Sequence, residues 1–467
     1  MAFEPMAMEE AERPEGRPEL RKVLRIRHVV AIGLGFTVSD GILLVISQEF
    51  GVTGPATILL TAVAALAMSA IMFAGAELAG SMPAADFAGE WGKRTLGSFW
   101  GFLGTLSYGA VAIIAIGLLW FPMGTYLQPF FPGVPVPVIG TVCFLITAGI
   151  VSAGVLFSGE TEVWLNVALF VVVLGMSVIA VFHFHASYFV PFFKGGLHGW
   201  FYAFPFIVYV LFGPEVMFAA SEENVISRRF WPKAMLVLML IVVGSFLFME
   251  VALTGLLTLS HYSLKSADFA VAGKFLFGQA GQDIFNIVAF VAVFHAMIGA
   301  MYVGSRFLYK MGRRGYLPET FGRVNRRTRV PYPALGLTLV IGAAIGSTYY
   351  VDSSFYLEAA ALLTMAGLFG WAIICSSHIS YRLQPRLRAQ YPGDWHVPPG
   401  DGPGGIWISV LGLVIVAVVT ISFLIQNAFN WWFLPLWVVI AIVWWRLAQR
   451  TVASREEEVS ANSGTGG

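Results

Sequence analysis

Charged residues are scarce in this sequence. Asp, Glu, Lys and Arg together make up 12% of its 467 residues, about half of the share in a typical soluble domain. Hydrophobic residues make up 57%, and the mean hydropathy is +0.76. This composition cannot supply the polar surface of a soluble protein of this size, so the sequence predicts a polytopic membrane protein.

The sequence also has only two cysteines and no nucleotide-binding motif. Cys143 and Cys375 both lie inside apolar runs, which argues against a disulfide framework or a zinc site and indicates two packing residues. We expect no metal and no cofactor. The sequence has no P-loop and no large polar segment, so ATP-driven transport is disfavoured. A net charge of +1 gives no indication of a nucleic-acid partner.

A cleavable signal peptide is not expected either. The first twenty residues contain six glutamates and no apolar core, whereas a signal peptide needs both a basic start and an apolar centre. The first apolar run is therefore expected to act as the insertion signal.

What the sequence does contain is a series of apolar runs near the length of about 20 residues that spans a bilayer as a helix. We expect an all-α fold with about twelve transmembrane helices. The expected spans are residues 29–47, 55–79, 99–124, 136–155, 163–183, 200–220, 234–259, 284–309, 333–351, 355–380, 406–425 and 431–447.

The distribution of lysine and arginine predicts the orientation. Most of the 28 basic residues fall in the connections on the side of the N-terminal tail, and basic connections stay in the cytoplasm. Only Lys194, Lys265 and Lys274 lie in connections on the opposite side. Both termini are therefore expected in the cytoplasm, which requires an even number of spans.

Two of the apolar runs are interrupted. Glycines and the pair Ser39 and Asp40 punctuate residues 29–46, and Gly213, Pro214 and Glu215 interrupt residues 199–220. Broken helices in corresponding places of two halves are typical of the binding site of a secondary transporter. Asp40 and Glu215 each lie 13 residues from a basic flank, hence about 20 Å from it along a helix. Both carboxyl groups are expected at the same depth.

Three stretches resemble the amino acid, polyamine and organocation (APC) superfamily of permeases. The stretch from Glu77 through Pro83 to Gly101 is similar to the signature between the second and third helices, although Asp86 and Phe87 replace its usual glycine pair. Residues 212–234 resemble the break and exit of the sixth helix, and residues 305–331 resemble the exit of the eighth. Together the three stretches cover roughly residues 29–392.

The resemblance implies a leucine-transporter-type fold, in which helices one to five and six to ten form a 5+5 inverted repeat with broken helices one and six. We expect a cytoplasmic tail at residues 1–26, the ten-helix core at 27–392, two further helices at 393–449 and a disordered tail at 450–467. The substrate is expected between the two breaks. The residues expected to bind it are Thr37, Ser39, Asp40, Gly41, Tyr209, Leu211, Phe212, Gly213 and Glu215.

Buried ionisable residues are candidates for carrying a coupled proton, because an isolated charge within a bilayer is costly. We name Asp40, Glu215, His295 and Glu250. The family's sodium-coupled members use hydroxyl groups of helix eight, but residues 287–303 contain no Ser or Thr. Its lysine on helix five, found in some proton-coupled members, is also missing from residues 160–191.

The sequence thus favours a secondary active transporter that moves an amino acid across the cytoplasmic membrane by alternating access, coupled to protons. A carrier of an amine or polyamine, and an amino acid exchanger without ion coupling, are the alternatives. A membrane-embedded enzyme is disfavoured because no catalytic constellation is visible. The partners expected are the small substrate and the bilayer, and the sequence leaves the oligomeric state open.

The missing hydroxyl pair gives a first prediction. Replacing sodium by choline at constant pH should leave the initial rate of uptake unchanged, because this chain lacks the oxygen ligands that sodium needs on helix eight. Uptake into proteoliposomes measures this. A large loss of rate in choline would mean that the chain supplies sodium ligands elsewhere.

Overall fold

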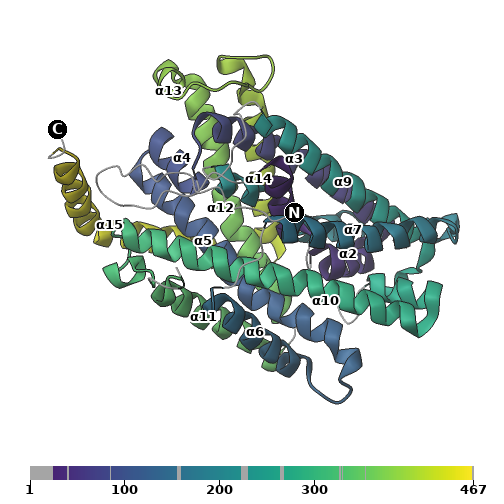
Figure 1. The fold of residues 1–467 in the computed structure, drawn as a ribbon. Helices are drawn as coiled ribbons and strands as arrows, with labels where there is room; N and C mark the ends of the chain where they lie inside the picture. The colour runs from purple at the N-terminus through teal and green to yellow at the C-terminus, as the bar shows by residue number, and fades with distance from the viewer. Residues whose placement is uncertain are drawn as a thin grey trace, which may run out of the picture.

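The computed structural model describes residues 25–38, 41–84, 86–154, 159–221, 230–262, 268–325, 328, 330–352, 354–426 and 428–464. These residues form helices joined by short connections, with no strand in the ranges described (Figure 1). The α-helices are α1 (Ile26–Thr37), α2 (Ile46–Thr53), α3 (Thr57–Ser81), α4 (Phe87–Thr95), α5 (Ser98–Leu127), α6 (Val136–Ser152), α7 (Gly159–Val181), α8 (Gly196–Val210), α9 (Trp231–Leu256), α10 (Asp268–Arg313), α11 (Tyr332–Ser347), α12 (Phe355–Leu383), α13 (Pro385–Gln390), α14 (Trp407–Gln426) and α15 (Ala428–Gly464).

Short 3-10 and π-helical turns complete the parts that matter for the site. They are η1 (Gly41–Val45), η2 (Gly54–Ala56), η4 (Ala186–Phe189), η5 (Pro214–Ser221) and η7 (Leu259–His261).

The helices agree with the expected spans. In the described residues, ten helical segments are long and apolar enough to cross a membrane. One of them, Ile26–Ser81, contains the first two expected spans, and the expected fourth span is the shorter apolar helix Val136–Ser152. Each of the twelve expected spans therefore falls on an apolar helix, and the chain is an all-α polytopic membrane protein.

The C-terminal segment differs from the expectation of a disordered tail. Helix α15 continues to Gly464 and so includes most of residues 450–467. The sequence there contains Ala453, Arg455 and Glu456–Glu458, which are good helix formers. The expectation of disorder used the low hydrophobicity of this tail and did not consider the helix propensity of its residues.

The pairing of helices follows a repeat of five spans. Helix α3, the second span, packs against α9, the seventh, and α5, the third, packs against α10, the eighth. The contact of α1 with α7 has its counterpart in α8 with α12, and that of α7 with α9 in α12 with α3. Exchanging each span with the one five places later thus reproduces the contacts, as expected for the inverted repeat.

The connections sort onto two ends of the bundle. At one end lie the connections that follow the even-numbered spans, from span two to span ten. Four contacts join these connections. These are Glu77 with Arg382, Asp86 with Arg314, Ala84 with Ser221, and Ser152 with Tyr332. We call this the basic end, because most of the lysine and arginine residues belong to these connections.

At the opposite end, connections that follow odd-numbered spans meet. Lys194 Nζ donates to the carbonyl of Gly51 at 2.6 Å, and the amide of His185 donates to the carbonyl of Gly255 at 2.7 Å. The two-sided arrangement that the charge distribution predicts is therefore present in the fold. Which end faces the cytoplasm stays a prediction.

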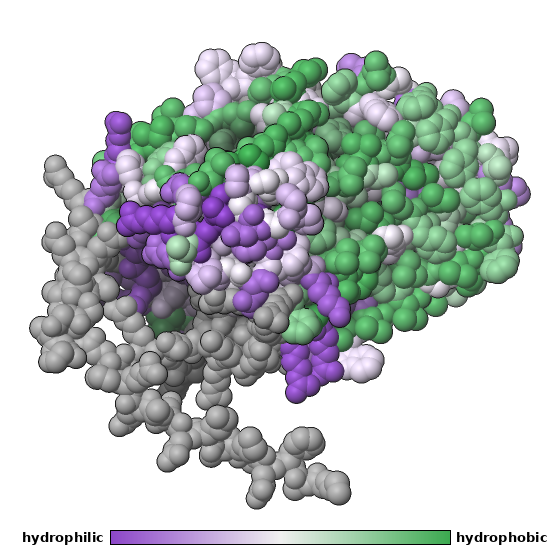
Figure 2. Space-filling view, turned by 90° about the horizontal axis from the view of Figure 1, so that it is seen from above, coloured by the Kyte–Doolittle hydropathy of each residue, from purple (hydrophilic) through white to green (hydrophobic). Residues whose placement is uncertain are grey.

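Apolar side chains cover the flank of the bundle. Figure 2 shows hydrophobic residues over most of the visible flank, with hydrophilic residues gathered toward one side. Large exposed side chains such as Leu66, Trp164, Val171, Leu240 and Val340 lie on spanning helices. A surface of this kind is stable against lipid and not against water.

A buried ion pair fixes the basic end. Glu77 of α3 accepts hydrogen bonds from Arg382 Nη2 at 2.6 Å and from the amide of Val397 at 2.8 Å. His378 Nε2 and His396 Nδ1 contact the same carboxylate at 3.2 and 3.1 Å. Arg382 and Glu77 are fully buried, so their charges are stable only because each satisfies the other.

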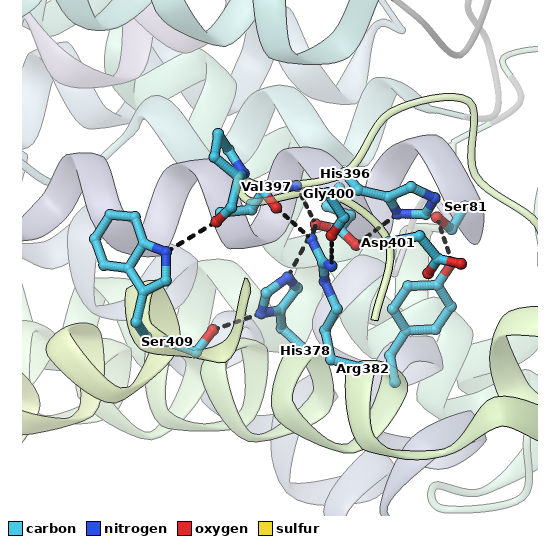
Figure 3. A network of polar contacts seen from close by, with 12 residues as sticks. Ser81, His378, Arg382, His396, Val397, Gly400, Asp401 and Ser409 are labelled. Carbon is cyan, nitrogen blue, oxygen red and sulfur yellow. Dashed lines mark hydrogen bonds and ion pairs between the residues drawn. The ribbon is translucent and has the colours of Figure 1, made fainter. Parts of the chain in front are cut away.

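Arg382 also holds the connection that follows α13 (Figure 3). Its guanidinium donates to the carbonyls of Val397, Gly400 and Gly402 at 2.5–2.9 Å, and His378 Nδ1 contacts Ser409 Oγ of α14 at 2.8 Å. The network therefore ties helices α3, α12 and α14 together through Arg382 and His378.

A second ion-pair cluster joins the two repeats at the same end. Arg314, just after α10, donates to Asp86 at 2.7 Å and to Glu90 of α4, and Thr105 of α5 donates to Asp86 at 2.7 Å. Burial opposes the charge of Arg314, but the carboxylates of Asp86 and Glu90 outweigh it and raise the pKa of the guanidinium. Asp86, which replaces a glycine of the family signature, thus has a structural partner.

The first network predicts a large effect of losing Arg382. Replacing it in Arg382→Met leaves Glu77 charged and buried, so the free energy of unfolding should fall by about 3–5 kcal/mol. Thermal unfolding in detergent measures the loss. Arg388→Met is the matched control, because Arg388 pairs with Asp401, which is 62% exposed, and such pairs contribute about 0–1 kcal/mol. Equal losses in the two variants would contradict this account.

Candidate functional site at the crossing of two broken helices

Both predicted breaks are present. Helix α1 ends at Thr37, and the chain resumes as the π-helical turn η1 and then α2. Helix α8 ends at Val210, and Leu211–Gly213 form a short link that is not α-helical and leads into η5. The first half of each broken span lies against the second half of the other, since α1 packs against η5 and α2 packs against α8. The two interrupted spans therefore lie antiparallel against each other, with their breaks at the same level.

Gly213 makes this close approach possible. Its φ is +127°, a backbone conformation that residues with a side chain rarely adopt. A Cβ atom at Gly213 would come within 2.6 Å of the amide nitrogen of Thr37 and 2.7 Å of the carbonyl carbon of Phe36. The backbones of the two breaks thus touch directly, with no side chain between them.

Gly41 plays the corresponding part on the other side of the crossing. A Cβ atom there would lie 3.1 Å from Cα of Val210 and 3.5 Å from the ring of Tyr209. Tyr209 is buried in the last turn of α8, so its ring lies beside the break in the first span. Thr37 is also buried, and its hydroxyl donates to the carbonyl of Gly33 at 2.7 Å.

Glu215 is bonded within the second break. One carboxylate oxygen accepts the amide of Gly213 at 3.1 Å, and the other accepts the indole N–H of Trp371 in α12 at 3.2 Å. The side chain is 1% exposed. It therefore closes the loop Gly213–Glu215 and ties it to α12.

Aromatic rings enclose Glu215. Phe212 stacks on Trp371 with ring centroids 4.2 Å apart and an interplanar angle of 9°. Tyr108 of α5 lies buried in the electrostatic field of Glu215, and Gly370 lets its ring approach α12, since a Cβ there would meet it at 2.5 Å. The neighbourhood of the break is therefore apolar and aromatic, with one acid in it.

A cavity of about 150 Å³ lies beside the first break. Residues of α1, α7 and α10 line it, among them Gly35, Val38, Asn166 and His295. Asn166 Nδ2 donates to the carbonyl of Ala31 in α1 at 3.1 Å. His295, proposed from the sequence as a proton carrier, thus reaches a cavity bounded by the broken helix.

The structure does not group all the predicted residues. Thr37, Gly41, Tyr209, Leu211, Phe212, Gly213 and Glu215 meet at the crossing, and His295 lies at the neighbouring cavity. Glu250 belongs to a separate contact, in which its carboxylate accepts the hydroxyl of Thr61 at 2.8 Å. Ser39 and Asp40 lie outside the described residues, so their roles stay predictions.

Sequence reasoning missed Trp371, Tyr108 and Asn166. Asn166 carried a signal, because an amide inside an apolar run needs a hydrogen-bond partner. Trp371 and Tyr108 carried none, since aromatic residues are common throughout the spanning helices.

Paired broken helices in an inverted repeat define a membrane transport protein of the secondary carrier class. Comparisons with known proteins agree. The amino acid permease family model matches residues 28–457. The chain therefore belongs to the amino acid permease family, and it is a secondary amino acid transporter of the APC superfamily.

Relatives of this family align over most of the chain. The aromatic amino acid transport protein AroP of Escherichia coli O157:H7 is 22% identical over 449 residues, which cover 93% of this chain and 96% of AroP. AroP of Salmonella typhimurium SL1344 is 23% identical over 448 residues, with shares of 93% and 96%. YvbW, an uncharacterized amino acid permease of Bacillus subtilis 168, is 23% identical over 413 residues, with shares of 85% and 91%.

The crossing predicts that Gly213→Ala impairs transport. The added Cβ meets the backbone of Thr37 and forces an unfavourable φ that costs about 1–3 kcal/mol, so the uptake rate should fall about tenfold or more. Initial uptake rates, normalised to the amount of folded protein, measure this.

Gly175→Ala is the matched control, because Gly175 lies on α7 with no atom within 4 Å of an added Cβ. It should transport like the parent. A Gly213→Ala protein with the parent's rate would show that the direct backbone contact is not required.

Proposed function

We propose that this protein is a proton-coupled importer of an amino acid, working by alternating access in the plasma membrane with the basic end and both termini in the cytoplasm. The observation that carries the proposal is the contact of the non-helical loop at Gly213 with the end of helix α1 at Thr37, in the interior of the bundle. Unpaired backbone groups in the interior of a membrane protein are stable where they line a ligand site.

The chemistry of the crossing suits an amino acid. N–H groups at a half-helix start attract a carboxylate, and carbonyl groups at a half-helix end attract an ammonium group. The substrate passes between them without chemical change, so we propose no enzymatic step.

We infer further that the side chain of the substrate is apolar and aromatic. Tyr209, Phe212, Trp371 and Tyr108 surround the second break, and aromatic rings bind other rings by stacking and edge contacts. Two of the relatives named above are aromatic amino acid transport proteins, which supports the same substrate class.

An amine carrier is the second candidate. The sequence places Asp40, an acid, where the family usually has a hydroxyl residue, and a carboxylate there favours a cationic ligand. Uptake of each of the twenty amino acids and a set of amines, with and without a pH gradient, decides between the two. Accumulation of phenylalanine, tyrosine or tryptophan that a pH gradient drives supports the proposal, whereas accumulation of amines alone overturns it.

Asp40→Asn separates the two roles of this residue. Because Asn mimics a protonated Asp, we expect binding and exchange of the amino acid to survive while accumulation driven by a pH gradient is lost. Equilibrium binding and gradient-driven uptake should be measured on the same preparation. Weaker binding of the ligand would instead assign Asp40 to a substrate ammonium group, because a buried cation would lose its partner.

A further inference from the structure

Two carboxyl groups inside the bundle have no part in the crossing. Glu49 lies in α2, after the first break, and Glu250 lies in α9. Their exposed fractions are 0% and 2%. Sequence analysis named Glu250 alone, since Glu49 stands at the end of an apolar run where a charged residue is ordinary.

Glu49 has no partner among the described residues. Neither carboxyl oxygen accepts a hydrogen bond, and no lysine, arginine or histidine lies within ion-pair distance. Of the elements packed on α2, helix α8 brings Tyr202 into its electrostatic field. The charged groups nearest along these elements are used elsewhere: Lys194 bonds the carbonyl of Gly51, and His261 of η7 bonds Thr258.

Glu250 is only half satisfied. One oxygen accepts the hydroxyl of Thr61 from α3, and the other has no partner in the described part of the chain. Helices α1, α7 and α10 and the turn η4 also pack on α9, but none of them places a described charged side chain in contact with this carboxyl group. Glu77, the single acid of α3, is bound to Arg382 at the basic end.

Three buried threonines lie between the two acids. Thr53 follows Glu49 by one turn of α2 and donates to its backbone carbonyl at 2.9 Å. The hydroxyls of Thr53 and Thr57 are 2.5 Å apart across the corner η2. Thr61 lies one turn beyond Thr57 on α3 and reaches Glu250. Three threonine hydroxyl groups therefore lie along the corner between α2 and α3, and the last of them bonds Glu250.

The protonation state of such groups depends on their surroundings. A carboxylate that is buried without a cation loses the stabilisation of its charge by water, and binding a proton removes that cost. The ion-paired acids at the basic end have no such need of a proton. The two unpaired acids, by contrast, are stable in this conformation when each holds one.

Resting on the proposed proton coupling, we propose that Glu49 and Glu250 form a proton-loading pair at the end opposite the basic end. Each carboxylate takes one proton from water when it is exposed, and it stays neutral while the bundle buries it. Thr53, Thr57 and Thr61 form the polar path between the two groups.

The positions of Glu49 and Glu250 explain how proton binding depends on whether water reaches the two carboxyl groups. Glu49 belongs to the half of the first span that packs on α8, and Thr61 and Glu250 join α3 to α9, which are equivalent helices of the two repeats. In this proposal, a movement that separates α2 from α8 and α3 from α9 exposes both carboxyl groups to water. Proton loss in the closed state would leave an unpaired charge in the interior, so the pair links closure to proton binding.

The test uses the full-length protein in proteoliposomes with pyranine inside and a radiolabelled amino acid outside, taken as the one of the twenty that the parent accumulates most. Glu49→Gln and Glu250→Gln imitate the neutral acids. Equilibrium exchange should stay within about twofold of the parent, while accumulation driven by a pH gradient should fall about tenfold or more. The pH dependence of uptake should flatten, and substrate-driven proton entry should decline.

Conservative and control variants separate this role from a structural one. Glu49→Asp and Glu250→Asp keep an acid and should restore accumulation. Glu319→Gln removes an exposed carboxylate in the connection after α10, at the basic end, and should behave like the parent. Accumulation by both Gln variants equal to that of the parent overturns the proton-loading pair, as does a loss of exchange that the Asp variants restore.

Failure of the pair differs visibly from failure of the proposed function. If the parent itself accumulates substrate equally well without a pH gradient, proton coupling is wrong, and the pair is wrong with it. If the parent is driven by the gradient and the Gln variants are too, only the pair is wrong.

Discussion

The structure depends on the need to satisfy backbone polar groups where no water is available. A continuous helix satisfies them internally, and this chain gives up that arrangement in two spans. It does so where the two breaks touch, with Gly213 against Thr37 and Gly41 against Val210. Glu215 then supplies an acceptor for the freed amide of Gly213 and anchors the loop to Trp371. Each break is stable because the other lies beside it, and the site that we propose for a zwitterionic ligand is at this contact.

Buried charge is treated differently at the two ends of the bundle. At the basic end, Glu77 and Asp86 are neutralised by Arg382 and Arg314, so these acids serve as permanent links between helices. At the opposite end, Glu49 and the second oxygen of Glu250 have no such cation among the described residues. A paired acid keeps its charge, whereas an unpaired buried acid gains stability by binding a proton. The same residue type therefore serves as a structural link at one end and is suited to proton exchange at the other.

How far the site could be predicted depended on whether a residue disturbs the pattern around it. The breaks were predictable, because Gly-Pro pairs and acids stand out in an apolar run and conflict with a continuous helix. Trp371 and Asn166 come from α12 and α7, distant in sequence from both breaks. Their nearness to the site follows from how the helices cross, which no local pattern encodes. Glu49 escaped notice because a carboxylate near the end of an apolar run is ordinary until its burial is known.

The sequence by itself determined the class of fold, the number of spans and the two-sided arrangement of the connections, since hydrophobic length and charge placement act locally on each segment as it enters a membrane. It also determined where two helices break. Only the tertiary structure decided which acids have partners. Glu77 and Glu49 are both single carboxylates in or beside apolar runs, yet one faces Arg382 and the other faces no cation among the described residues. That difference comes from helix packing between distant segments, because the energy of a buried charge depends on neighbours in space and not in sequence.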